Sequence, residues 1–307
     1  MEREKLNGER DVLMRDVTER LEEVYAPSAA RAGAWQLIEV LTGKKRAQLV
    51  AADGVVLSDS QQKELRGWLD RIVGKHEPIQ YIIGSVPFID TTVAVRPPVL
   101  VPRPETESWV AGLIEKLKTL PNKKLRILDL GAGSGCIAIS LAKALPDAEV
   151  MATDISDEAL KLARENAENN KVANVSFMRS DLFDSLEGEE AFDLIVSNPP
   201  YVAEGDWKGL DERITRWEDK GALVAPQEGL AILKRIVEQA PRFLRENEQL
   251  ARVGIAQLYL EIGSSQGPDV AQEMKQHGYR DVTVTKDLLS RDRIVSGSVA
   301  HVDAQTT

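Results

Sequence analysis

The chain has 307 residues and a formal net charge of -10, an acidic balance that argues against stable binding to nucleic acid, which needs a basic face. With 43% hydrophobic and 29% charged residues, the chain is expected to be globular and is long enough for two domains. One cysteine excludes an internal disulfide framework, three scattered histidines give no metal-ligand spacing, and no run approaches the roughly twenty apolar residues of a membrane span.

The first part of the chain has helical periodicity from about Arg10 to Lys75. Hydrophobic residues recur every three or four positions in successive segments, which Gly43 and Ser58 help to separate. We therefore predict a helical domain of three to five helices over residues 1–77. Nothing in it has the pattern of a catalytic group, so we interpret it as a packing or substrate-recognition module.

Residues 78–104 form a predicted linker. Alternating apolar positions at Tyr81–Ile83, Phe88–Ile89 and Val93–Val95 favour a β-hairpin, and a proline-rich stretch then imposes extended backbone. The second domain, residues 105–307, follows. A helix is expected to begin at Pro104, which suits a first helical turn.

A glycine loop follows the first strand of this second domain. The apolar run Arg126–Leu130 leads into the loop, and a helix is predicted from Cys136 to Leu145. Glycines let the backbone approach a ligand closely, and the helix start presents free N–H groups. The loop comprises Gly131, Ala132, Gly133, Ser134 and Gly135.

A second strand is predicted over Ala148–Thr153 and ends in Asp154, about twenty residues beyond the loop. At this distance from a glycine loop, an acidic side chain typically binds the ribose hydroxyls of a nucleoside. A nucleoside-containing cofactor is indicated. The G-x-G-x-G spacing differs from the dinucleotide fingerprint only at Cys136, so the loop alone leaves a dehydrogenase open.

The rest of the chain alternates strands and helices, which is typical of a parallel sheet covered on both faces. Ser156 is a suitable N-cap for the next helix. Residues 202–228 form an unusually long, irregular connection of the kind that often serves as a lid. The later expected elements are helices at about 229–244 and 269–277 and strands at 257–262, 282–285 and 294–299.

The most informative motif, Asn198-Pro199-Pro200-Tyr201, ends the apolar run that starts at Phe192. Pro199 and Pro200 have fixed φ and no N–H, so their carbonyls and the Asn198 side chain can accept hydrogen bonds from a planar nitrogen nucleophile. Tyr201 offers a flat face for stacking. The plainer interpretation is that the prolines only end a strand and Tyr201 belongs to the core.

Taken together, these motifs indicate an S-adenosylmethionine (SAM) enzyme. In a doubly wound sheet the carboxyl ends of neighbouring strands line one crevice. The glycine loop, Asp154, Asp181-Leu182 and Asn198 would then meet there, after the first, second, third and fourth strands.

The motifs together resemble the HemK/PrmC-type protein-(glutamine-N(5)) methyltransferases that modify peptide chain release factors. The resemblance spans nearly the whole chain, and its most specific part is the proline-rich motif from Pro102 to Glu107. It implies a Rossmann-like class I SAM-dependent methyltransferase fold, with a seven-stranded, mostly parallel sheet whose last strand is antiparallel, after a small N-terminal helical domain. The other matching segments are Glu77–Gly84, Asp129–Gly135, Ser197–Tyr201 and Glu261–Gly263.

The resemblance also implies roles for single residues. Gly131 to Gly135 would surround the methionine and ribose end of SAM, Asp154 would bind the ribose hydroxyls, and Asp181 and Leu182 would lie at the adenine. Asn198 would contact both cofactor and substrate, with Pro199, Pro200 and Tyr201 completing the substrate site; Asn198, Pro199 and Tyr201 are the expected catalytic residues. No metal is expected.

The implied substrate is the glutamine of the Gly-Gly-Gln motif in a class 1 peptide chain release factor. Two alternatives stay open: an adenine-N(6) nucleic-acid methyltransferase, which shares the Asn-Pro-Pro-Tyr motif, and a non-enzymatic SAM-fold binding protein. We expect a cytoplasmic monomer without membrane association, or a protein of the mitochondrial matrix if the chain is a processed organellar form.

Overall fold

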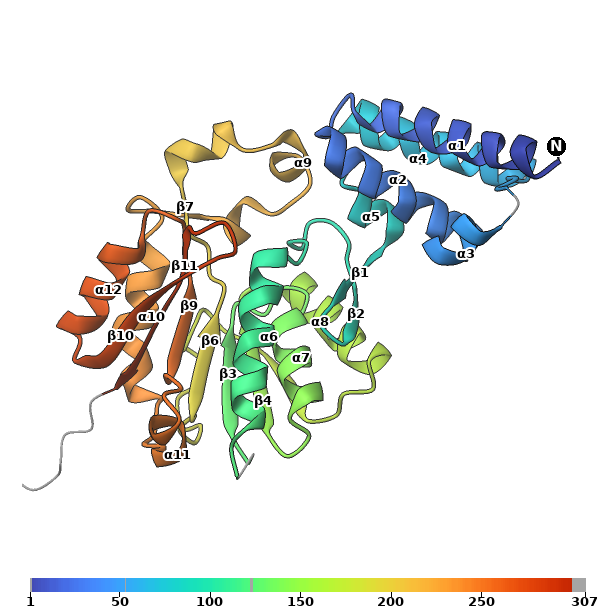
Figure 1. Cartoon of the computed structure of the whole chain (residues 1–307). Coiled ribbons are helices and arrows are strands. Elements are labelled where there is room, and N and C mark those ends of the chain that lie inside the picture. Colours follow the sequence, from blue (N-terminus) through green and yellow to red (C-terminus); the bar gives the residue numbers. More distant parts are fainter. Residues whose placement is uncertain (1, 53, 122–123, 300–307) are drawn as a thin grey trace, which may run out of the picture. The chain divides into compact units, whose positions relative to one another are not determined.

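The computed structural model describes residues 2–52, 54–121 and 124–299, with side chains from residue 10 onward (Figure 1). The chain divides into two compact units. One comprises Met1–Gly84 with Asp211–Trp217, and the other comprises Ser85–Leu210 with Glu218–Thr307. Among the helices in the described ranges, none is both long and apolar enough to cross a membrane.

The first unit is helical, as the sequence predicted. Ser58 caps one helix by accepting a hydrogen bond from the Gln61 N–H. The apolar faces enclose a separate core that includes Val17, Leu37 and Ile72. Its helices are α1 (Glu2–Leu21), α2 (Pro27–Thr42), α3 (Arg46–Ala51), α4 (Asp59–Lys75), α5 (Ile79–Ile83) and α9 (Glu212–Thr215).

Helix α5 corrects one prediction, since Tyr81–Ile83 was expected in a β-hairpin. The helix starts directly after Pro78 and ends at Gly84, whose φ of 81° and N–H bond to the Gln80 carbonyl terminate it. A mostly apolar segment of five residues fits either the helical or the strand period, and these two end residues favour the helix. The hairpin consists only of β1 (Ser85–Phe88) and β2 (Thr91–Ala94), which pair antiparallel.

The second unit contains a seven-stranded sheet with the order β10-β11-β9-β6-β3-β4-β5. Strands β9, β6, β3, β4 and β5 are parallel, whereas the last strand, β11, is antiparallel to both neighbours. The predicted fold class is therefore confirmed. The strands are β3 (Arg126–Leu130), β4 (Glu149–Asp154), β5 (Val175–Arg179), β6 (Leu194–Ser197), β9 (Leu258–Glu261), β10 (Tyr279–Lys286) and β11 (Asp292–Val299).

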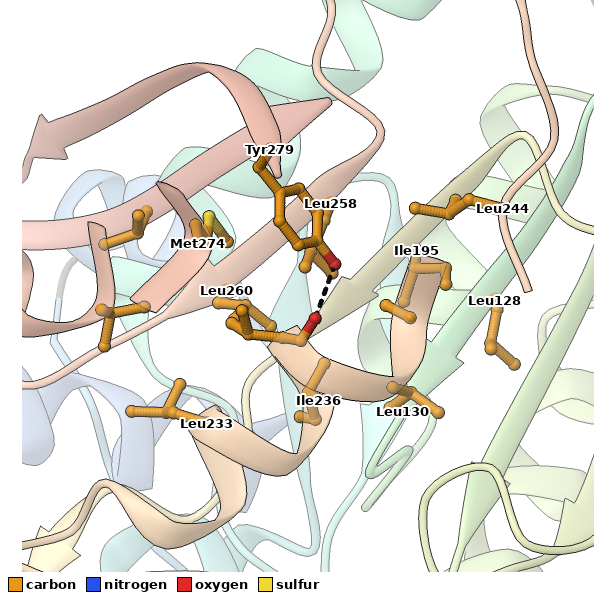
Figure 2. Close-up of a cluster of buried hydrophobic side chains, with 14 of the residues drawn as sticks. Leu128, Leu130, Ile195, Leu233, Ile236, Leu244, Leu258, Leu260, Met274 and Tyr279 are labelled. Carbon is orange, nitrogen blue, oxygen red and sulfur yellow. Dashed lines mark hydrogen bonds between the residues drawn. The ribbon is translucent and has the colours of Figure 1, made fainter. Parts of the chain in front are cut away.

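Helices cover both faces of this sheet (Figure 1). On one face α10 and α12 pack over a buried cluster in which the Tyr279 hydroxyl donates to the Val237 carbonyl over 3.0 Å (Figure 2). Helices α7 and α8 pack on the strands of the other face, and α6 packs against α7. The helices are α6 (Pro104–Lys118), α7 (Cys136–Ala144), α8 (Asp157–Asn169), α10 (Ala231–Gln239), α11 (Glu248–Arg252), which was not predicted, and α12 (Gly267–Gln276).

The sequence predicts an irregular connection over residues 202–228, but the structure contains short regular elements there. β7 (Val202–Ala203) and β8 (Val224–Ala225) pair in parallel at its ends, with short helical turns between them. Its middle segment belongs to the helical unit. There the Trp217 indole N–H donates to the Lys75 carbonyl over 3.0 Å, and the Arg213 guanidinium lies 3.8 Å from the Tyr25 ring centroid.

Candidate active site

The carboxyl ends of four adjacent strands carry the predicted site residues. In the order β6-β3-β4-β5, these ends lead to Asn198, Gly131, Asp154 and Asp181. Strand β3 pairs in parallel with β6 and β4, and in this register Leu130 lies opposite both Ser197 and Thr153. Because parallel strands end at the same edge of a sheet, the structure brings the predicted elements together there.

The glycine loop turns tightly at this edge. The N–H groups of Gly131 and Ala132 both donate to the Thr153 carbonyl over 2.8 Å. Gly131, Gly133 and Gly135 have φ values of 76°, 53° and 81°, which residues with a side chain rarely adopt. The three glycines thus allow a turn that keeps the backbone open to a ligand.

Asp154 links the loop to the next strand. One carboxylate oxygen accepts from the Gly133 N–H over 2.8 Å, and the other accepts from the Ser156 N–H over 2.9 Å. Burial raises the pKa of this carboxyl, while those N–H groups act in the opposite direction. Each carboxylate oxygen keeps a further lone pair, so the side chain can still accept from ligand hydroxyls.

Asp181 and Leu182 follow β5, but both already have protein partners. The Arg235 guanidinium donates to the Asp181 carboxylate over 3.1 Å. Leu182 has a φ of 51° and packs against the buried cluster beneath the sheet edge. The adenine contacts expected of this pair stay predictions.

Asn198 lies close to the glycine loop. A Cβ atom built on Gly131 would be 4.0 Å from the Asn198 carbonyl oxygen. Tyr201 packs against the core, and burial raises the pKa of its hydroxyl to about 12. The Gln266 side chain donates to the Tyr201 carbonyl over 2.9 Å, which fixes the end of the Asn-Pro-Pro-Tyr turn.

The Asn198 side chain is held by residues that are far away in the sequence. Its Nδ2 donates to Thr106 Oγ1 over 3.1 Å, and Thr106 Oγ1 donates to Glu261 Oε2 over 2.7 Å. The Trp109 indole N–H donates to the same carboxylate oxygen over 2.8 Å, and the Tyr201 hydroxyl lies 3.5 Å from the other one. Glu261 is only 1% exposed, and this burial raises the pKa of its carboxyl.

Comparisons with known proteins match both the N-terminal part and the rest of the chain. A family model described as the PrmC N-terminal domain matches residues 13–84, and one described as the methyltransferase small domain matches residues 111–215. The release factor glutamine methyltransferase of Bacteroides thetaiotaomicron is 38% identical over 285 residues, which cover 92% of this chain and 97% of the relative. The one from Salmonella typhimurium is 37% identical and covers 91% and 96%.

The chain belongs to the release factor glutamine methyltransferase family. The resemblance drawn from the sequence is thereby confirmed, as is the expectation of a SAM-dependent methyltransferase. A solved structure of the hMettl16 catalytic domain, bound to a MAT2A 3′UTR hairpin, has a TM-score of 0.51, 16% identity and coverage of 83% of this chain and 88% of that one. At that identity the likeness concerns the fold alone.

The residues present fit the methyl donor of this family. Asp129 is fully buried at the base of the glycine loop, where Oδ2 accepts from the Ala138 N–H over 3.1 Å. Among the described residues, its Oδ1 has no hydrogen-bond partner. SAM carries an ammonium group, two ribose hydroxyls and an adenine amino group, all of which can donate hydrogen bonds. The carboxylates of Asp129 and Asp154, at the carboxyl edge of the sheet, can accept such bonds.

Sequence reasoning about the site missed Thr106, Trp109 and Glu261. Two signals existed: Thr106 lies within the proline-rich motif, and Glu261 opens the last matching segment. Neither revealed that the two side chains form hydrogen bonds, because they are 155 residues apart.

The charged residues of the proline-rich motif form ion pairs or hydrogen bonds with other residues of the protein. Arg103 pairs with the buried Glu218 carboxylate, and Glu105 lies 3.4 Å from Arg291. Glu107 accepts from the Ile89 N–H over 2.7 Å. These three residues tie the start of α6 to neighbouring segments of the second unit.

Proposed function

We propose that this protein transfers a methyl group from SAM to the side-chain amide nitrogen of the glutamine in the Gly-Gly-Gln motif of class 1 peptide chain release factors. The observation that carries the proposal is the position of Asn198-Pro199-Pro200-Tyr201 next to the glycine loop, on adjacent strands β6 and β3. The names of the relatives, which match over almost their whole length, supply the substrate class.

A carboxamide nitrogen is a poor nucleophile because its lone pair is delocalised into the carbonyl. We assign its alignment to Asn198 Oδ1 and the Pro199 carbonyl, each accepting one of its two hydrogens. Both acceptors bind more strongly as positive charge grows on nitrogen, so they stabilise the transition state more than the ground state. Alignment of this kind can supply roughly 7–11 kcal/mol of barrier reduction in favourable cases.

The other predicted residues complete the site. SAM, when bound, supplies an electrophilic methyl group on a sulfonium. We assign Gly131, Ala132, Gly133, Ser134 and Gly135 to its methionine and ribose end, Asp154 to the ribose hydroxyls and Asp181-Leu182 to the adenine. Pro200 stiffens the substrate turn, and Tyr201 contacts the glutamine side chain. No general base is required, because methyl transfer first leaves a cationic, N-protonated N-methyl amide, which is strongly acidic and loses its proton to water or a nearby carbonyl.

We further assign release-factor recognition to the helical domain of residues 1–77, with residues 78–104 as a linker and 105–307 as the methyltransferase domain. The separate core around Leu37 and Ile72 supports a domain of its own. We propose that the protein is a monomer in the cytoplasm and forms no stable complex with nucleic acid, since its net charge is -10.

The test is incubation of the protein with methyl-labelled SAM and separate pools of a class 1 release factor and of DNA. We expect label in the release factor and none in the DNA. Label in the DNA alone would favour the adenine-N(6) alternative, and no label in either pool would favour a binding protein. A release factor with glutamine replaced by alanine in the Gly-Gly-Gln motif is the matched control and should stay unlabelled.

A further inference from the structure

The hydrogen bonds from Asn198 to Glu261 have a defined direction. The Trp109 indole N–H can only donate, so Glu261 Oε2 acts as an acceptor. The Thr106 hydroxyl donates to the same Oε2, over 2.7 Å. Because a hydroxyl has a single hydrogen, Thr106 Oγ1 can then only accept from Asn198.

This direction determines how the Asn198 carboxamide is turned. The NH₂ end faces Thr106 Oγ1 at 3.1 Å, so Oδ1 points away from Thr106. The two ends of a carboxamide have nearly the same shape and differ mainly in hydrogen bonding. A flipped Asn198 would place its oxygen against the Thr106 lone pairs and would present NH₂, a donor, to the substrate.

We propose that Glu261 and Thr106 are positioning residues that hold the Asn198 carboxamide with Oδ1 toward the glutamine amide of the substrate. This inference rests on the proposed function. Glu261 acts through Thr106, and neither needs to contact the substrate. Successive hydrogen bonds polarise one another, so donation from Asn198 toward a buried carboxylate also makes Oδ1 a stronger acceptor.

The arrangement joins three elements: Thr106 lies in the first turn of α6, Asn198 follows β6, and Glu261 ends β9. It explains why a carboxylate that is 1% exposed is found at this sheet edge. Trp109 and Thr106 both donate to Glu261 Oε2. Of these two residues, Thr106 is the one that also accepts a hydrogen bond from Asn198. Loss of the Thr106 hydroxyl removes both a bond to Glu261 and the acceptor for Asn198, whereas loss of the Trp109 indole N–H removes a bond to Glu261 alone. Comparing the two losses therefore distinguishes positioning of Asn198 from stabilisation of Glu261.

The experiment compares Thr106→Val, which keeps the shape but loses the hydroxyl, with Thr106→Ser, which keeps the hydroxyl. Steady-state methylation of the release factor should show kcat reduced about 10- to 100-fold in T106V and by less than about threefold in T106S. The KM for the release factor and the calorimetric Kd for SAM should stay within about threefold in both variants. Trp109→Phe is the control for loss of a bond to Glu261, and its kcat should fall far less than that of T106V.

Equal kcat values for T106V and T106S, with methylation by the unaltered protein intact, would overturn the positioning role while leaving the proposed function in place. Equal losses in T106V and W109F would also overturn it, because they would indicate support of Glu261 alone. If the unaltered protein does not methylate the release factor, the proposed function itself fails. Thr106→Ala replaces T106V in the same comparison if the valine variant does not fold.

Discussion

The Asp154 carboxylate accepts a hydrogen bond from the Gly133 N–H over 2.8 Å, so the acid at the end of β4 also shapes the loop that follows β3. Its second oxygen accepts from the Ser156 N–H, directly before α8. A single side chain therefore connects two neighbouring strand ends and a helix start. Loss of this carboxylate should disturb both the loop and any ribose contact.

We expect Asp154→Ala to weaken SAM binding about 10- to 100-fold, because a hydrogen bond to a charged group contributes about 1.5–3 kcal/mol. Isothermal titration calorimetry measures this change. Asp157→Ala is the matched control, since that carboxylate lies on the surface, where it pairs with Arg179 at 3.5 Å. An unchanged Kd in the Asp154 variant would contradict the assignment to the ribose.

Alanine at Gly135 should destabilise the protein more than alanine at Gly133. At Gly135 φ is 81° and a Cβ would lie 2.9 Å from Ile139 Cδ1 and 3.0 Å from Ala163 Cβ, whereas at Gly133 φ is 53° and nothing lies within 4 Å. We expect the free energy of unfolding to fall by about 2–4 kcal/mol for G135A and about 1–2 kcal/mol for G133A. Urea denaturation measures both; equal losses would mean that close packing against α8 is unimportant.

Asp129 should make the stability of the SAM-free protein depend on pH. Burial raises the pKa of this carboxyl from 3.8 to about 7, so between these pH values the folded protein retains a proton that the unfolded chain has released. Stability from this source is present at low pH and is lost as pH rises toward 7. One pKa unit corresponds to about 1.4 kcal/mol.

The measurement is the difference in free energy of unfolding between the unaltered protein and Asp129→Asn at several pH values. From pH 5 to pH 8 the unaltered protein should lose up to about 3 kcal/mol relative to the variant. Other titrating groups cancel in this difference. Parallel stability profiles would show that Asp129 titrates normally in the folded state.

Much of the fold could be predicted from the sequence because its signals are local. The strand Arg126–Leu130, its glycine loop and the helix from Cys136 are found where the apolar pattern predicts them. Helix α5 was misread, because a run of five residues is too short for its period to distinguish helix from strand. The docking of residues 211–217 on the helical unit depends on Trp217 and Arg213 contacts that leave no local pattern.

The same distinction applies to the site. Residues that follow strand ends, such as Asp154 and Asn198, could be predicted, because parallel strands bring their carboxyl ends to one edge. Thr106 and Glu261 could not, because their roles depend on hydrogen bonds between a helix start and two strand ends that are distant in sequence. The partner of Asp181 was also missed, since Arg235 lies 54 residues away on α10.

The central claim is that Asn198 holds the accepting glutamine amide, and the most direct measurement is the position and rate of methylation by the unaltered protein and by Asn198→Ala. Tandem mass spectrometry of the release factor after reaction at saturating SAM locates the methyl group. We predict a methyl group on the side-chain nitrogen of the Gly-Gly-Gln glutamine, formed at least about 100-fold more slowly by N198A, with a SAM Kd within about threefold. A methyl group at another residue, or an undiminished rate in N198A, would contradict the account.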